Sequence, residues 1–278
     1  SEEIRSDNLF LFRNSCIRGH LDVAQWIRQT FHITDKEIKT NINEILWWSC
    51  INGHLEVAQW LYNTFHITPE EISSHDDKIF QECCRTGRLD IIQWLYNTLF
   101  IAPEKSETIV NIFLDYCAIG YMDGVLWIYN TFHITRDDVI TNNCQAFHLS
   151  CSSGQLELAS WLHHTFHIDA SNETLIGINQ AFQKSCEEGH LGIAQWLCDT
   201  FQIIDEIPRT YLINNIFWDT CRYGHLEVVQ WLYTKFKVTP EEIRTYNIRD
   251  HPNVFLGNYM DVSQWLRDTF GVSFDEGT

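Results

Sequence analysis

The sequence predicts an all-α fold: an α-solenoid of about eight helix-turn-helix repeats, each of about 34 residues. The first observation behind this prediction is a tryptophan that recurs at almost constant spacing. It stands at Trp26, Trp60, Trp94, Trp127, Trp161, Trp196, Trp231 and Trp265, in steps of 34, 34, 33, 34, 35, 35 and 34 residues. The second is a glycine shortly before all but the last of these tryptophans. The third is an apolar spacing of three and four residues on both sides of that glycine.

A single domain, residues 1–278, holds the predicted repeats. Their ranges are near 8–41, 42–75, 76–109, 110–142, 143–176, 177–211, 212–246 and 247–278. We expect the last repeat to be a degenerate cap, because Asn258 replaces the glycine and Pro252 interrupts the first helix. Residues 1–7 resemble the tail of another repeat, since residues 2–5 reproduce residues 241–244, and we expect them to belong to a missing upstream repeat.

The first helix of each repeat precedes the glycine, and residues 44–52, EILWWSCIN, exemplify it. Small residues near its end allow a neighbouring helix to approach closely. Seven of the 10 cysteines share one position, three residues before the glycine: Cys16, Cys50, Cys84, Cys117, Cys151, Cys186 and Cys221. One cysteine per repeat is typical of a packing position, so we expect buried, reduced thiols and an intracellular, cytoplasmic protein.

The glycine ends the first helix, because only glycine enters the left-handed conformation without a steric penalty from Cβ. The second helix begins two residues later and usually holds a carboxylate such as Glu56 in its first turn, where the helix dipole favours it. We expect the tryptophan to hold adjacent repeats together. In the second repeat the predicted core stripe is Leu55, Val57, Ala58, Trp60, Leu61 and Phe65.

The segment after the second helix predicts a short third helix. Thr68 with Glu71, and Thr239 with Glu242, have capping-box spacing with proline at the first helical position. Two further pairs repeat this pattern less completely: Thr34 with Glu37, and Thr135 with Asp138.

Composition excludes several classes of function. Hydrophobic residues make up 45% of the chain, which is enough for a continuous core. The formal net charge is −18 and no basic cluster offsets it, so nucleic-acid binding is disfavoured. The apolar runs are too short for a membrane-spanning helix, and the polar N-terminus is unlike a signal peptide. We therefore expect neither nucleic acid nor membrane as a partner.

The possible metal ligands and catalytic groups have a simpler structural interpretation. Cys-x3-His occurs four times, beginning at Cys16, Cys50, Cys186 and Cys221. Equivalent cysteines on stacked helices would lie too far apart to share one ion. A second histidine column, beginning at His32, changes to other residue types along the chain, and no unique set of nucleophile, base and orienting group is present. We expect no metal, no cofactor and no enzymatic activity.

Certain first-helix positions vary freely between repeats, as a recognition surface requires. Trp47, Trp48 and Trp218 lie outside the repeated tryptophan position, and tryptophan and tyrosine are favoured interface anchors. The alternative for Trp47 or Trp218 is packing in the gap between its own repeat and the next. The candidate partner-binding residues are Arg13, Ile17, Trp47, Trp48, Ile51, Gln81, Arg85, Leu114, Trp218, Arg222 and Tyr223.

Residues 53–61, GHLEVAQWL, follow a helix that ends in small residues, and this combination resembles the ankyrin repeat. The resemblance covers nearly the whole chain. Two features depart from it: residues 44–47 replace the Thr-Pro-Leu-His segment, and a capping-box turn replaces the β-hairpin between repeats. The chain is similar to the divergent ankyrin-type arrays of large DNA viruses and protists. This resemblance implies that the variable first-helix positions line a concave groove.

The expected function is non-catalytic protein–protein interaction through that groove, by a monomeric scaffold. The acidic net charge and the aromatic anchors suit a partner protein whose surface is basic and partly apolar. The alternative is a structural or self-associating spacer segment of a larger protein.

Overall fold

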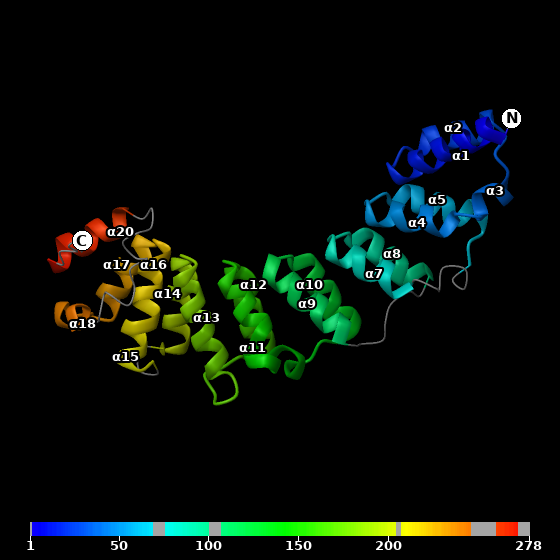
Figure 1. Ribbon diagram of the computed structural model, residues 1–278. Helices are drawn as coiled ribbons and strands as arrows, with labels where there is room; N and C mark the ends of the chain where they lie inside the picture. Colours follow the sequence, from blue (N-terminus) through cyan, green and yellow to red (C-terminus); the bar gives the residue numbers. More distant parts are fainter. Residues whose placement is uncertain (1, 69–75, 100–106, 204–206, 246–259, 272–278) are drawn as a thin grey trace. The chain divides into compact units, whose positions relative to one another are not determined.

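The computed structural model describes residues 2–68, 76–99, 107–203, 207–245 and 260–271 (Figure 1). These residues are helical or lie in turns, and no β-strand occurs within the five ranges. The predicted all-α class is therefore confirmed. The chain groups into two compact units: unit 1 comprises residues 1–115 and 126–132, and unit 2 comprises residues 116–125 and 133–278.

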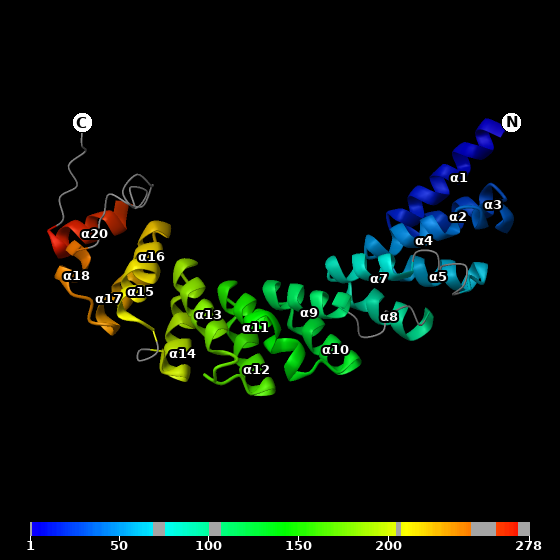
Figure 2. The ribbon, with the colours of Figure 1, turned by 60° about the horizontal axis from the view of Figure 1, so that its bottom comes forward.

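Unit 1 consists of antiparallel helix pairs. Its described helices are α1 (Glu2–Ile17), α2 (Leu21–Thr30), α3 (Asp35–Lys39), α4 (Ile42–Ile51), α5 (Leu55–Phe65), α7 (Asp76–Arg85) and α8 (Leu89–Leu99). Helix α9 (Glu107–Ile119) and α10 (Met122–Phe132) contribute residues to both units. The first helices α1, α4 and α7 pack side by side, and each packs on its own second helix (Figures 1 and 2).

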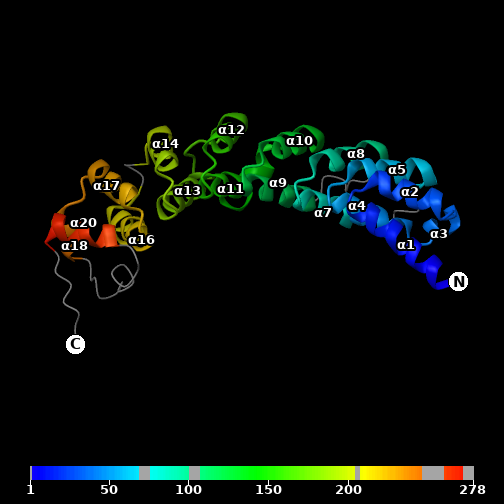
Figure 3. The same cartoon turned by 90° about the horizontal axis from the view of Figure 1, so that it is seen from above.

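Unit 2 repeats this arrangement. Its helices are α11 (Arg136–Ser152), α12 (Leu156–Phe166), α13 (Leu175–Glu187), α14 (Leu191–Phe201), α15 (Arg209–Tyr211), the π-helix η2 (Leu212–Phe217), α16 (Trp218–Tyr223), α17 (Leu226–Lys235), α18 (Pro240–Thr245) and α20 (Met260–Phe270). The first helices α11, α13 and α16 pack in sequence, and α12, α14 and α17 pair with them (Figure 3).

The junction glycines adopt the predicted left-handed conformation. Seven of them have φ between +68° and +87°. A Cβ atom on Gly19 would lie 2.4 Å from Nδ1 of His54, the residue that follows the next junction glycine. Arg88, Gln155, His190 and His225 cover the preceding glycines in the same way. Glycine is therefore required twice, for its backbone conformation and for the close approach of the next repeat.

A buried hydrogen bond joins consecutive first helices. The Ser49 hydroxyl donates to Ile45 O of its own helix at 2.7 Å and lies 3.3 Å from Cys16 O of the preceding repeat. Ser150 and Ser185 repeat the contact to Cys117 O and Cys151 O, at 3.4 and 3.3 Å. These serines and cysteines are all buried. The predicted packing role of these serines and cysteines is confirmed by their burial and by the contact between helices.

The repeated tryptophans connect adjacent repeats but are not fully buried. The Trp60 ring centroid lies 6.1 Å from that of Phe12 in the preceding repeat and 5.8 Å from that of Phe65 in its own. Trp127, Trp196 and Trp231 make the same two kinds of contact. In the predicted core stripe of α5, Leu55 and Trp60 are half-buried, whereas the other four residues are buried. The indole thus lies at the edge of the inter-repeat contact.

The connecting segments contain the predicted caps. Thr34 N donates to Glu37 at 2.9 Å, Thr135 N to Asp138 at 2.7 Å and Thr239 N to Glu242 at 2.8 Å. The short helices α3 and α18 begin directly after the first and third of these threonines. The box predicted at Thr68 with Glu71 lies outside the described residues, because residues 69–75 are not described. The same holds for Pro252 and Asn258, on which the predicted cap depends.

Residues 2–7 belong to α1, which runs without a break to Ile17. Residues at the equivalent place in the next repeat form α3, which ends at Lys39 before α4 begins at Ile42. The chain segment that the sequence assigned to an upstream repeat is therefore continuous with the first helix. Arg5, in this segment, forms an ion pair with Glu37 of the α3 cap.

Helix α11 contains a kink that α13 accommodates. Asn142, Asn143 and Cys144 have positive φ angles of 51°, 60° and 57°. A Cβ atom on Gly177 of α13 would lie 2.0 Å from the carbonyl oxygen of Asn143. The kinked backbone and the glycine therefore fit together, and the pairing of α11 with α13 depends on both.

We expect Gly177→Ala to reduce the free energy of unfolding by about 2 kcal/mol or more, because backbone atoms cannot yield as a flexible side chain can. Gly192→Ala, on α14, is the matched control, since its Cβ would meet no atom within 4 Å. That variant should unfold at the parent's denaturant midpoint or slightly above it. Equal midpoints for the two variants in urea titrations would contradict the interpretation.

A second prediction concerns the cap of α18. Arg209 donates from Nε and Nη2 to Glu242 at 2.6 and 2.7 Å. Its Nη1 also donates to Phe236 O at 2.5 Å, and its Nη2 to Lys237 O at 3.0 Å. The hydrogen bond from Arg209, followed by those from Thr239, lowers the pKa of Glu242 from 4.5 to about 2. The stabilising contribution of Glu242 is thus complete above pH 4.5 and is lost as the pH falls towards 2.

We therefore expect Glu242→Gln to destabilise the protein at neutral pH by at most ~1 kcal/mol, because the pair is partly exposed to solvent. The difference from the parent should shrink steadily between about pH 5 and pH 2. Denaturant unfolding across this range measures it. Glu241→Gln removes the same charge one residue earlier and should cost less at neutral pH; a pH-independent difference for Glu242→Gln would refute the assignment.

Candidate functional site

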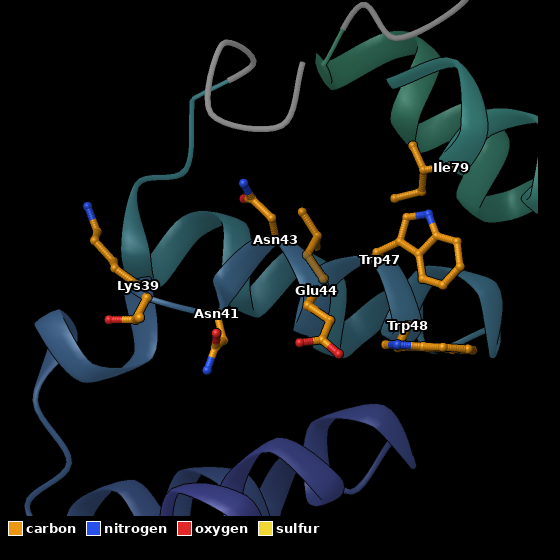
Figure 4. Close-up of a pocket in the computed structure, with 9 residues that line it drawn as sticks. Lys39, Asn41, Asn43, Glu44, Trp47, Trp48 and Ile79 are labelled. Atoms are coloured by element: carbon orange, nitrogen blue, oxygen red, sulfur yellow. The ribbon is translucent and has the colours of Figure 1, made fainter. Parts of the chain in front are cut away.

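A cavity of about 420 Å³ opens on the first helix of the second repeat, within unit 1. Helix α4 supplies most of its lining, the end of α3 supplies the rest of one side, and Ile79 of α7 closes another (Figure 4). The lining residues are Lys39, Thr40, Asn41, Asn43, Glu44, Leu46, Trp47, Trp48 and Ile79. The cavity thus combines indole and aliphatic surface with amide, hydroxyl and charged groups, a composition typical of ligand-binding pockets.

Two adjacent tryptophans dominate the cavity. The Trp47 and Trp48 ring centroids lie 4.7 Å apart with an interplanar angle of 84°. Trp47 extends towards Ile79 of α7 and is half-buried, whereas 38% of Trp48 is exposed (Figure 4). The edge-on contact holds both indoles in place, so a ligand that covers Trp48 would meet an ordered ring.

The charges around the cavity are balanced. Glu44 forms an ion pair with Arg13 of α1, which ties the cavity wall to the first repeat. Lys39 supplies a positive charge at the α3 side. The acidity of the whole chain is therefore not concentrated in this cavity.

The equivalent positions of α13, in unit 2, carry a polar network instead. Gln183, Lys184 and Glu187 stand where Trp47, Trp48 and Ile51 stand in α4, counted from the repeated tryptophan. Gln183 donates to Glu187 at 2.6 Å, and Lys184 pairs with the same carboxylate, which is only 4% exposed. The hydrogen bond from Lys184 to Glu187 raises the Lys184 pKa. The same three helix positions thus carry apolar side chains in one repeat and hydrogen-bonded polar side chains in another.

Two further first helices carry an ion pair at the positions equivalent to Lys184 and Glu187. Glu82 with Arg85 on α7 lie 2.7 Å apart, and Asp219 with Arg222 on α16 lie 3.1 Å apart. Opposite charges three residues apart on a helix can meet, so this pairing was readable from the sequence. Of the candidate contact residues, Arg13, Arg85 and Arg222 are therefore already engaged within the chain.

The structure corrects one candidate. Trp218 is only 1% exposed and packs edge-on against Phe217, with ring centroids 5.8 Å apart. Trp218 is therefore buried and is not available as a surface anchor. Its repeat follows a 35-residue step and contains the π-helix η2 directly before Trp218. Trp47, its equivalent, lies in the α-helix α4 instead.

The remaining candidates differ in accessibility. Ile17, Ile51, Gln81 and Leu114 are half-buried, and Tyr223 is exposed. The structure brings Trp47 and Trp48 together at one cavity. It does not bring the other candidates into that lining.

Sequence reasoning missed most of the polar cavity lining, namely Lys39, Thr40, Asn41, Asn43 and Glu44. A helical signal for part of it was present, because Asn43, Glu44, Trp47 and Trp48 follow the three-and-four spacing of one helix face. Ile79 had no such signal, since its position depends on how α7 packs on α4.

All ten cysteines are buried and free of disulfides. Burial raises the pKa of the Cys16 and Cys83 thiols to about 12, which keeps them protonated at neutral pH. Within the described ranges no cluster of three or more His, Cys, Asp and Glu residues is arranged to hold a metal ion. No helix of the described part of the chain is both long and apolar enough to cross a membrane.

We expect almost none of the cysteines in the native chain to react with a thiol reagent at neutral pH, because the thiols are both inaccessible and protonated. Titration with an aromatic disulfide reagent measures this directly. Reaction in guanidinium chloride should reveal all ten thiols. Rapid modification of several cysteines in the native chain would show that the inter-repeat contacts open more readily than the packing implies.

No protein-family model matches the chain, and no curated protein matches it at a significant level. A role for the protein must therefore be inferred from its own residues and their geometry.

Proposed function

We propose that this protein is a non-catalytic interaction scaffold that binds a partner protein through the exposed face of its first helices. The observation that carries the proposal is the Trp47–Trp48 pair at a 420 Å³ cavity, on a face whose equivalent positions change from repeat to repeat. Buried aromatic anchors surrounded by polar groups supply most of the binding energy in protein interfaces.

The proposed architecture is an ankyrin-like α-solenoid of about eight repeats. Its support is the helix pair described at seven of the repeated tryptophans, the left-handed glycine between the two helices of these pairs, and the packing of first helices on one another within a unit. The connectors are capped helical turns such as α3 and α18 in place of hairpins, as in a divergent form of that repeat.

The contrast between constant buried contacts and variable exposed positions favours binding over catalysis. The serine, cysteine and glycine contacts recur between repeats, whereas the exposed first-helix positions carry indoles, amides or ion pairs. A rigid scaffold with variable surface positions limits the entropy lost on binding, because few backbone segments need to become ordered.

The proposed partner presents an apolar or aromatic side chain to the cavity and basic residues around it. The cavity offers indole and aliphatic walls, with Asn41 and Asn43 able to bond a peptide backbone. The net charge of −18 attracts a basic partner over a distance even though Lys39 and Glu44 balance locally. Association should therefore slow as salt is added, while dissociation changes little.

The test is selection of a random peptide library displayed on phage against the intact chain. Peptides that carry an aromatic or aliphatic residue flanked by lysine or arginine should be enriched. For a selected peptide, Trp48→Ala should weaken binding at least about tenfold without changing the melting temperature. Fluorescence anisotropy of the labelled peptide and circular dichroism measure the two effects.

Trp218→Ala is the matched control, because it also removes an indole outside the repeated position. Since Trp218 is buried, that variant should lose about 3–5 kcal/mol of stability while the folded fraction binds peptide as the parent does. Peptides that bind Trp48→Ala as tightly as the parent would rule out the cavity as the recognition site.

A further inference from the structure

Glu44 and Trp48 place a carboxylate beside an indole ring on α4. They stand four residues apart, so their side chains are neighbours on the helix surface. Figure 4 shows the Glu44 carboxylate and the Trp48 ring on the side of α4 that faces the first repeat. Both residues are exposed. A planar cation that pairs with this carboxylate can therefore also lie against the indole ring.

The chain already holds a guanidinium at this carboxylate. Arg13 of α1 donates from Nη2 to Oε1 of Glu44, and both side chains remain partly exposed. Among the described residues, no other group donates a hydrogen bond to the Glu44 carboxylate. Its second oxygen is therefore available to an incoming donor. The internal pair also indicates which chemical group this place accepts, namely a guanidinium.

Two other Arg–Glu pairs, about one period apart in the sequence, have a more complete geometry. Arg5 donates from Nε and Nη2 to both oxygens of Glu37, and Arg209 does the same to Glu242. Two parallel hydrogen bonds give such a pair more energy and a defined geometry. The pair of Arg13 with Glu44 has one hydrogen bond and is open to water, so exchanging Arg13 for another guanidinium costs little.

The fold itself stacks a guanidinium on an aromatic ring. The Arg28 guanidinium carbon lies 4.9 Å from the centroid of the Phe65 ring in the next repeat. A tryptophan face attracts such a cation more strongly than phenylalanine does. Trp48 is held edge-on by Trp47, so its ring is already ordered. An external arginine can thus gain a second hydrogen bond to Glu44 and a ring contact, neither of which Arg13 makes within the described residues.

We propose that Arg13 is an internal competitor of the partner: an arginine of the partner displaces it, pairs with both oxygens of Glu44 and lies on the Trp48 ring. This rests on the proposed function, because it names one of the basic residues that the partner presents beside its apolar side chain. Arginine is preferred to lysine, since a lysine ammonium neither forms two parallel hydrogen bonds to one carboxylate nor stacks as a plane.

The sign of one substitution separates competition from support. If Arg13 competes, removal of its guanidinium strengthens the binding of a cation, because the carboxylate becomes free and a nearby positive charge disappears. If Arg13 only orients Glu44, the same removal weakens binding or leaves it unchanged. Arg13→Met tests this, since methionine retains much of the aliphatic stem. Arg18→Met is the matched control, because it removes the same charge from an exposed side chain in the turn after α1.

The test is titration of the full chain with N-acetylarginine amide, followed by the indole N–H resonance of Trp48 in NMR spectra. Trp48→Phe identifies that resonance. The arginine amide should shift it saturably, the lysine amide should bind more weakly, and the neutral citrulline amide should not bind. Arg13→Met should lower the dissociation constant about two- to fivefold. Glu44→Gln should raise it at least about fivefold, and Arg18→Met should leave it nearly unchanged. If Arg13→Met lowers the melting temperature, Arg13→Gln takes its place.

An unchanged or higher dissociation constant in Arg13→Met overturns the proposal, and so does an equal gain in Arg18→Met. A Trp48 resonance that the citrulline amide shifts as strongly as the arginine amide overturns it too. The proposed function is decided separately, by the peptides selected from the library. If those peptides bind through Trp48 but bind Glu44→Gln as tightly as the parent, the arginine site fails and the proposed function stands. If the arginine amide behaves as expected but no peptide is selected, the arginine site stands and the proposed function fails.

Discussion

The fold depends on the close approach of consecutive first helices. Ser49 reaches Cys16 O of the preceding helix, and Gly19 leaves room for the His54 ring, so one small residue and one missing side chain set the helix separation. Larger groups at either place would part the helices and remove the contact between Phe12 and Trp60. The same serine contact recurs in unit 2 at Ser150 and Ser185, so these interfaces between repeats share one physical basis.

These contacts between consecutive first helices do not involve the exposed side of the helices, where the residue type can vary. Helix α4 carries Trp47 and Trp48 there, whereas α13 carries Gln183 and Lys184 bonded to a buried Glu187. The two surfaces differ in what binding a partner would cost. Covering the indoles breaks no hydrogen bond, whereas the groups of the polar network already have their hydrogen bonds within the chain. For that reason the proposed recognition site lies in unit 1 even though the variable positions extend through the sequence.

Local chemistry made the helices, the capping threonines and the left-handed glycines predictable, because each depends on neighbours a few residues away. The burial of single side chains depended on packing instead. Trp47 and Trp218 occupy equivalent positions, yet the first lines a cavity and the second is buried in the core. The cavity itself needed Ile79 from another helix. Such features follow from tertiary contacts that spacing along one helix does not encode.

The contact between a junction glycine and the residue that follows the next one has a consequence for how such a gene can change in length. Five junction glycines meet their complement one period later, as Gly53 meets Arg88 and Gly154 meets His190. Loss or duplication of one whole period would rejoin a glycine to a residue of the corresponding kind. The array can therefore be lengthened or shortened by recombination in complete units, with its internal seams restored each time and only its two ends left to be adapted.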